Sequence, residues 1–145
     1  MVRVNLIDPS FLSDQHLIAE YNEILMLASY IERYPLRECE VESIPGEYCL
    51  GKGHMRFFKD KGPYLIERHE TLKKEMRKRG FTPRKTLSLK KAVNCAGRPY
   101  APAEKDKEII KKRLLEKIEL KPDYYRYMGE KKTPDFFRGL IRDSF

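Results

Sequence analysis

The amino-acid sequence predicts an all-α fold, in which three main helices and the long loops between them form a single compact domain. Three segments carry apolar residues at intervals of three and four positions, the spacing that places them on one face of a helix. The 9 prolines and 8 glycines lie mostly between these segments. At 145 residues, the chain can bury one sizeable core, so we expect one domain over residues 1–145.

The first predicted helix begins at Ser13 and Asp14, whose side chains are typical N-caps. It ends before Pro35, because proline cannot continue a helix. Its apolar stripe consists of Leu17, Tyr21, Ile24, Ala28 and Ile31.

Three polar residues of this helix are candidates for a functional face. His16, Glu20 and Glu23 are separated by four and three positions, so we expect them to share a face beside the apolar stripe. A carboxylate on that face can meet solvent or a ligand.

The other two main helices have clear starts and ends. Pro63 suits a first helical position, and the run Lys78–Gly80 puts cations in a last turn with glycine after it. The third helix is expected over Glu104–Leu120, which precedes a proline. The residues predicted to face inward are Leu65, His69, Leu72 and Met76 in the second helix and Ile110, Leu114 and Ile118 in the third.

The connecting segments are predicted to be irregular. Pro35–Gly62 has one expected helical turn, at Met55–Phe58, and its cluster Gly51–His54 is no nucleotide-binding P-loop because no Lys-Ser or Lys-Thr pair follows the second glycine. Phe81–Pro102 is a basic loop suited to phosphates. Val2–Leu12 is too short for a strand pair, so we expect it to cross the surface of the helices and to leave its end free to enter a cleft.

The charge of the chain indicates a polyanionic partner. It has 30 Lys and Arg against 22 Asp and Glu, a formal net charge of +8. Cations gathered on one face release counterions when they neutralise phosphates, which favours binding to nucleic acid. The alternative is a basic protein whose charge serves solubility alone.

Cysteine usage and hydropathy indicate a soluble cytoplasmic protein. Cys39, Cys49 and Cys95 form an odd, widely spaced set that suits neither a disulfide framework nor a metal site. No run approaches the ~20 apolar residues of a membrane span, and the start of the chain lacks the pattern of a signal peptide. We therefore expect no membrane association.

Aromatic residues alternate with a cation after the third helix, from Tyr124 to Gly129. Aromatic faces can stack on bases and arginine can hold a phosphate, so Tyr125 and Arg126 are candidate nucleic-acid contacts. The alternative is a tyrosine-rich edge of the core.

Four blocks of sequence, in this order and spacing, resemble the pyrimidine-dimer DNA glycosylases, the phage UV endonuclease family. The blocks are Arg3 to Glu23, Leu50 to Lys61, Lys78 to Phe81, and Arg113 to Gly129. The resemblance covers residues 1–129 and leaves 130–145 as a C-terminal extension. Phe136, Phe137, Leu140 and Ile141 predict a short amphipathic helix in that extension.

The resemblance implies a DNA repair glycosylase that is also an abasic-site lyase and acts on UV-induced pyrimidine dimers. It implies covalent catalysis by the α-amine of the mature chain, here that of Val2 after removal of Met1, which forms an imine with the deoxyribose. Glu23 stands at the position of the family's catalytic carboxylate. The N-terminal segment would lead to the active site, and neither a metal nor a cofactor is expected.

The resemblance also implies the residues that contact DNA. These are Arg3, Gln15, His16 and His54, with Arg113 and Lys117 on the third helix. Each has a plain alternative, because the two histidines can be structural donors and the two cations a solvated face. The expected partner is damaged double-stranded DNA, bound by a monomer.

Two departures from the family pattern affect these expectations. Val2 replaces the family's threonine, although only its backbone nitrogen is needed. Asn22 and Met26 stand where the family carries arginines beside the catalytic glutamate. Their neutrality leaves open a glycosylase and lyase for another damaged base or for abasic sites alone. A further alternative is a catalytically silent DNA-binding module that retained the fold.

Overall fold

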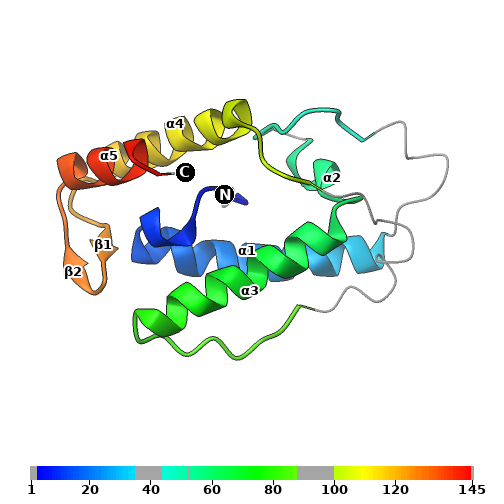
Figure 1. The fold of residues 1–145 in the computed structure, drawn as a ribbon, viewed down its shortest axis with the longest axis horizontal. Helices are drawn as coiled ribbons and strands as arrows, with labels where there is room; N and C mark the ends of the chain where they lie inside the picture. Colours follow the sequence, from blue (N-terminus) through cyan, green and yellow to red (C-terminus); the bar gives the residue numbers. More distant parts are fainter. Residues whose placement is uncertain (1–2, 35–43, 52, 88–99, 145) are drawn as a thin grey trace.

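A computed structural model of the chain describes residues 3–34, 44–51, 53–87 and 100–144. Helices make up most of it, which confirms a mostly helical fold, and the described residues add one two-stranded antiparallel sheet (Figure 1). The elements are η1 (Pro9–Phe11), α1 (Asp14–Arg33), α2 (His54–Phe57), α3 (Gly62–Lys78), α4 (Glu104–Leu120), β1 (Arg126–Tyr127), β2 (Glu130–Lys131) and α5 (Pro134–Arg142).

Helix α1 begins where the sequence predicts. The Ser13 hydroxyl accepts a hydrogen bond from the His16 amide at 3.1 Å, so it satisfies one of the amides that a helix start leaves unpaired. All five residues of the predicted stripe are buried, and this face packs against α3. The hydrophobic side of α1 therefore forms one wall of the core.

The predicted bounds and inward faces of α3 and α4 are also confirmed. Helix α3 has Pro63 in its first turn and is followed by Gly80 with a φ of 90°, a left-handed conformation that glycine adopts without strain. Every residue predicted to face inward on the two helices is buried. Helix α4 packs against α5 and lies across the molecule from α1 and α3 in Figure 1.

The N-terminal segment corrects one prediction, because it lies inside the molecule and not across its surface. Val4, Leu6 and Ile7 are buried, and in Figure 1 this segment, in dark blue, lies between α1 and α4. Leu6 has a φ of 60°, and the Ile7 amide donates to the Asn5 carbonyl at 2.6 Å across it, in a tight three-residue turn. Burial of these apolar side chains outweighs the local strain.

The C-terminal part contains a hairpin that the sequence did not reveal. Strands β1 and β2 pair through a turn at Met128 and Gly129, both with positive φ, the turn type that two-residue hairpins prefer. The hairpin spans the boundary drawn between residues 129 and 130. The predicted amphipathic helix is present as α5, whose buried residues are Phe137 and Ile141.

None of the helices in the described part of the chain is both long enough and apolar enough to cross a membrane.

Candidate functional site

A basic pocket lies between the start of α1 and the second half of α4. Its volume is about 300 Å³. It is lined by Gln15 and His16 from α1, by Arg113, Lys117 and Lys121 on and just after α4, and by Asn5, Ala19, Tyr124 and Tyr125. The fold thus brings five of the predicted DNA-contacting residues into one concave surface: Gln15, His16, Arg113, Lys117 and Tyr125.

The cations of the pocket follow from the spacing of α4. Arg113, Lys117 and Lys121 are four positions apart, so they project from one side of the helix. The inward residues of α4 occupy the adjoining stripe and fix how this side faces α1. The residues that line the pocket include three cations and no carboxylate, which suits an anionic ligand.

His16 is a neutral side chain within this basic surface. Its ring stacks on Tyr125 at a centroid distance of 4.7 Å, and its Nδ1 lies 3.0 Å from the Ser13 hydroxyl. Burial, and then the positive charges of Arg113 and Lys117, lower its pKa to about 4. His16 therefore offers the pocket a flat aromatic face and hydrogen bonding, and no positive charge at neutral pH.

The aromatic segment that follows α4 is held by α1. Gln15 donates from Nε2 to the Tyr124 carbonyl at 3.0 Å and accepts the Arg126 amide at 2.9 Å. Asp14 accepts the two amides of the hairpin turn, from Met128 at 3.0 Å and Gly129 at 2.8 Å. Both polar atoms of the Gln15 amide are therefore used to hold the segment that forms the pocket wall.

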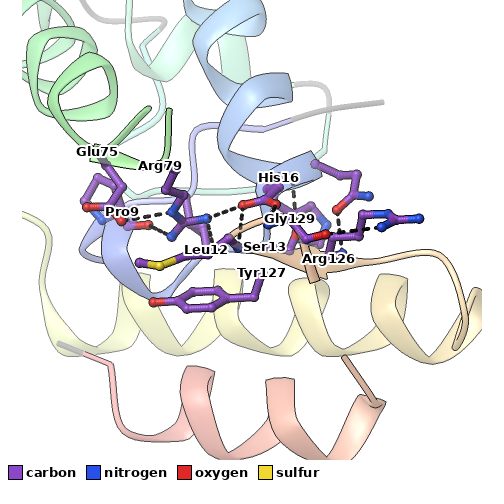
Figure 2. Close-up of polar contacts among 12 residues, drawn as sticks. Pro9, Leu12, Ser13, His16, Glu75, Arg79, Arg126, Tyr127 and Gly129 are labelled. Atoms are coloured by element: carbon purple, nitrogen blue, oxygen red, sulfur yellow. Dashed lines mark hydrogen bonds and ion pairs between the residues drawn. The ribbon is translucent and has the colours of Figure 1, made fainter. Parts of the chain in front are cut away.

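Figure 2 shows the buried arginine that completes this anchor. Arg79, from the end of α3, donates to Asp14 at 3.0 Å and to Glu75 at 2.9 Å. It also donates to the carbonyls of Leu12, Pro9 and Ser10. The Tyr127 ring covers its guanidinium at 4.6 Å. Because one fully hydrogen-bonded arginine joins α3, η1, α1 and the hairpin, the pocket wall is rigidly placed.

Glu23 lies beyond the pocket lining, on the partly exposed side of α1. Burial raises the pKa of its carboxyl, and the charges of Arg3 and Arg113 oppose that increase. Arg3 also acts on Arg113, whose pKa is lowered by burial and then by the Arg3 charge. A carboxylate and two arginines from three distant parts of the sequence therefore influence one another electrostatically, and one of them, Arg113, lines the basic pocket.

Glu20 corrects a second prediction, because it does not share an open face with Glu23. Its side chain is fully buried and receives two hydrogen bonds from Arg68 of α3, at 2.7 and 3.0 Å. Arg68 also donates to the Ile7 carbonyl at 2.6 Å. Glu20 and Arg68 therefore form a structural ion pair that joins α1, α3 and the N-terminal segment.

Residues 1–89 match a protein-family model described as pyrimidine dimer DNA glycosylase. The match covers more than half of the chain. The chain belongs to this family. It is therefore a DNA repair glycosylase, an enzyme that acts on DNA, and the concave basic surface fits that substrate.

Only some of the predicted site residues lie within the range that matches the family model. The matched range contains Arg3, Gln15, His16, Glu23 and His54, whereas the cations of α4 and the aromatic segment lie beyond it. The fold joins the two parts, because the pocket combines α1 with α4.

Three predicted residues lie elsewhere or cannot be described. Val2, the predicted nucleophile, lies outside the described residues. His54 is buried near Val4, and both of its ring nitrogens contact backbone atoms, which favours its structural interpretation. Arg126 is exposed on β1, outside the pocket lining, and donates to the Gly129 carbonyl.

Sequence reasoning missed Lys121, Tyr124 and Asn5 as lining residues of this glycosylase pocket. Lys121 continues the four-residue spacing of Arg113 and Lys117, so the pattern could have revealed it. Tyr124 is 52% exposed at the pocket rim, and the Lys121 ammonium lies 4.9 Å from its ring centre. Asn5 is almost fully buried, and no local pattern signals its position.

Proposed function

We propose that this glycosylase also cuts the DNA strand as an abasic-site lyase, that its substrates are pyrimidine dimers, and that the α-amine of Val2 is the nucleophile. The observation that carries the proposal is Glu23, a partly exposed carboxylate of α1 whose pKa is raised by burial and which feels the charges of Arg3 and of Arg113, a residue of the basic pocket. Removal of Met1 exposes the required amine.

The chemistry uses one amine and one carboxylate. The lone pair of the α-amine bonds to the sugar carbon C1′ while the bond from C1′ to the damaged base breaks, and the base leaves with a proton. The sugar ring then opens to a protonated imine. This imine acidifies the C2′ hydrogen, whose loss expels the 3′ phosphate and cuts the strand. Hydrolysis of the imine by water frees the amine.

Glu23 serves this sequence in two ways. Its negative charge stabilises the cation that develops on the sugar as the base leaves. Its carboxylate then relays protons during ring opening and elimination. A raised pKa favours the second role, because a carboxyl group that titrates nearer to neutral pH exchanges protons more readily.

The basic pocket is assigned to the DNA backbone and to bases near the lesion. Arg113, Lys117 and Lys121 bind phosphates, and the stacked pair His16–Tyr125 presents an aromatic surface to the distorted duplex. The neutrality of His16 suits contact with a base more than contact with a phosphate.

A second substrate class is supported by the exposed face of α1. Met26 is 64% exposed and Asn22 is also exposed, so this face carries neutral side chains where the family carries arginines. Weaker phosphate contact there favours lesions that open the duplex more readily, such as abasic sites. A panel of duplexes containing a dimer, an abasic site or another damaged pyrimidine will rank the two classes.

The test of the function is trapping of the imine by borohydride. The chain that begins at Val2 should form a covalent adduct with dimer-containing duplex, because borohydride reduces an imine to a stable amine. The same chain with an acetylated α-amine should form none, whereas Lys117→Ala should still form it. Adducts are measured by denaturing electrophoresis and located by peptide mass.

Two results would overturn this proposal. An adduct that forms equally well with the blocked amine makes a lysine the nucleophile. Tight DNA binding without any adduct or base release, on every duplex of the panel, identifies a catalytically silent DNA-binding module.

A further inference from the structure

Two side chains and one backbone carbonyl, from one loop and the following helix, hold residues 3 and 4 next to the predicted nucleophile. The Arg3 Nε donates to the Leu50 carbonyl at 2.9 Å. The Val4 amide donates to His54 Nε2 at 3.2 Å, and the Val4 carbonyl accepts from the Tyr48 hydroxyl at 2.9 Å. We call Tyr48, Leu50 and His54 the N-terminal clamp.

The hydrogen bonds of His54 fix its protonation. Its Nδ1 lies 2.8 Å from the Cys49 carbonyl, which can only accept, so Nδ1 carries the proton. The Val4 amide can only donate, so Nε2 must be unprotonated. His54 is therefore a neutral imidazole of one defined tautomer. Burial supports this state by lowering its pKa to about 4.

The clamp is rigid because it is built into the core. Tyr48 is 3% exposed and His54 is 2% exposed, and their rings meet edge to face at 5.4 Å. Tyr48 also meets Phe57 and Phe58 edge to face. A Cβ atom at position 53 would lie 2.9 Å from Cys49 Sγ and from Pro45 Cγ. The close packing of the loop at this point therefore favours glycine.

We propose that the N-terminal clamp is the positioning device of the covalent step, in which Tyr48 and His54 hold both polar groups of the Val4 backbone and thereby aim the α-amine at the sugar. This inference rests on the proposed function. The clamped Val4 is two residues from the amine, so little chain remains in which its direction can vary. Fixing a nucleophile in this way lowers the entropy cost of attack.

The clamp also explains why His54 is absent from the basic pocket. A histidine that binds phosphate needs an accessible ring nitrogen and gains from positive charge. His54 has neither, because both nitrogens are engaged within the protein and the ring is buried. Its role is therefore exerted through Val4 and not through direct contact with DNA.

Tyr48→Phe is the cleanest variant, because it removes one hydroxyl and keeps the ring. His54→Met removes the acceptor for the Val4 amide at similar volume, and His54→Gln restores an acceptor at the same distance along the side chain. The matched control is Tyr100→Phe. Tyr100 contacts the same phenylalanines, but its hydroxyl donates to Asp106 at the start of α4.

Two measurements separate positioning from folding and binding. The first is the single-turnover rate of borohydride trapping at saturating abasic duplex, together with the Kd for an uncleavable abasic analogue. We expect Tyr48→Phe to slow trapping about 10-fold and His54→Met about 10²-fold, with Kd unchanged. His54→Gln and Tyr100→Phe should trap at rates near that of the unaltered chain.

The second measurement is hydrogen exchange of the Val4 amide in the protein without DNA. It should exchange slowly in the unaltered chain and in Tyr100→Phe, and faster in His54→Met. Unchanged trapping rates in both Tyr48→Phe and His54→Met, or a Val4 amide that exchanges freely in the unaltered chain, would overturn the clamp. Failure of the unaltered chain to trap DNA would instead overturn the proposed function, and Val4 exchange would still decide the clamp.

Discussion

Two glutamates on the same helix differ in almost every physical property. Glu20 is fully buried and forms a two-point ion pair with Arg68, whereas Glu23 is partly exposed and has a raised pKa. Both belong to α1, and three positions separate them. The residue type and the local helix are therefore equal, and the difference comes from the elements that face each side chain.

Helix α3 places the Arg68 guanidinium against Glu20. Arg68 is fixed there because it also donates a hydrogen bond to the Ile7 carbonyl. Glu23 has positive neighbours that influence it, Arg3 and Arg113, and it still keeps access to solvent. A carboxylate whose charge is fully neutralised stabilises a fold, while one that is incompletely neutralised can respond to a substrate. We therefore expect a structural role for Glu20, whose charge is fully paired, and a catalytic role for Glu23, whose charge is only partly neutralised.

The largest expected effect is on catalysis, from Glu23→Gln. Glutamine keeps the shape but cannot carry negative charge or relay protons, so base release and strand cutting should fall about 10²–10⁴-fold. Binding of DNA should persist, because cations provide it. Rates on dimer and abasic duplexes measure the first effect, and a binding titration measures the second.

The stability of Glu23→Gln provides the contrast. Burial raises the carboxyl pKa, so the folded state binds the proton more tightly than the unfolded state and stability falls as pH rises above 4.5. Glutamine removes that cost. The variant should be no less stable than the unaltered chain at pH 7, and a clear loss of stability would contradict the assignment of an open carboxylate.

Glu20→Gln should have the opposite profile. It leaves the buried Arg68 guanidinium without its counter-charge, which costs about 3–5 kcal/mol of unfolding free energy. Denaturant unfolding measures the loss. Any folded fraction should release bases at a rate near normal, and a stable but inactive Glu20 variant would move the catalytic role to that residue.

The histidines extend the comparison to pH. Burial is the largest cause of a lowered pKa in all three, to about 4 for His16 and His54. The unfolded state therefore binds more protons between pH 6.5 and 4, so stability should fall as pH falls through that window. Proton NMR titration should find the imidazoles of His16 and His54 neutral at pH 6, and titration of either one near 6.5 would contradict its burial.

The smallest expected effect is that of Lys117→Ala on DNA binding. Removing one phosphate contact should reduce the slope of log affinity against log salt by about 1. The control is Lys105→Ala on the same helix, because that lysine is exposed, lies outside the pocket and pairs with Glu47 at 2.7 Å. Equal changes in the two slopes would remove the distinction between the pocket and the rest of the basic surface.

The features that could be predicted from the sequence are those that local rules determine. Apolar spacing and capping residues placed α1, α3 and α4, and the spacing from Arg113 to Lys117 indicated one basic helix side. Family resemblance assigned the catalytic carboxylate to Glu23. The match over residues 1–89 shows the family, and the role of Glu23 stays a prediction.

The features that could not be predicted depend on contacts distant in sequence. The burial of Glu20 requires Arg68, which is 48 positions away. The burial of residues 4–7 depends on their position between α1 and α4, which no local sequence pattern indicates. The hairpin depends on Asp14, whose carboxylate holds its turn from 114 and 115 positions away.

Because Val4 is held in place, the number of residues before it limits how far the α-amine can lie from Val4. From the Val4 nitrogen, two residues extend at most about 7 Å, and each further residue adds up to about 3.6 Å. On the proposed mechanism, a retained methionine, or the one or two residues that a cleaved affinity tag leaves behind, should move the α-amine past its target even though the fold is untouched. Recombinant preparations of this enzyme should carry their tags at the other end.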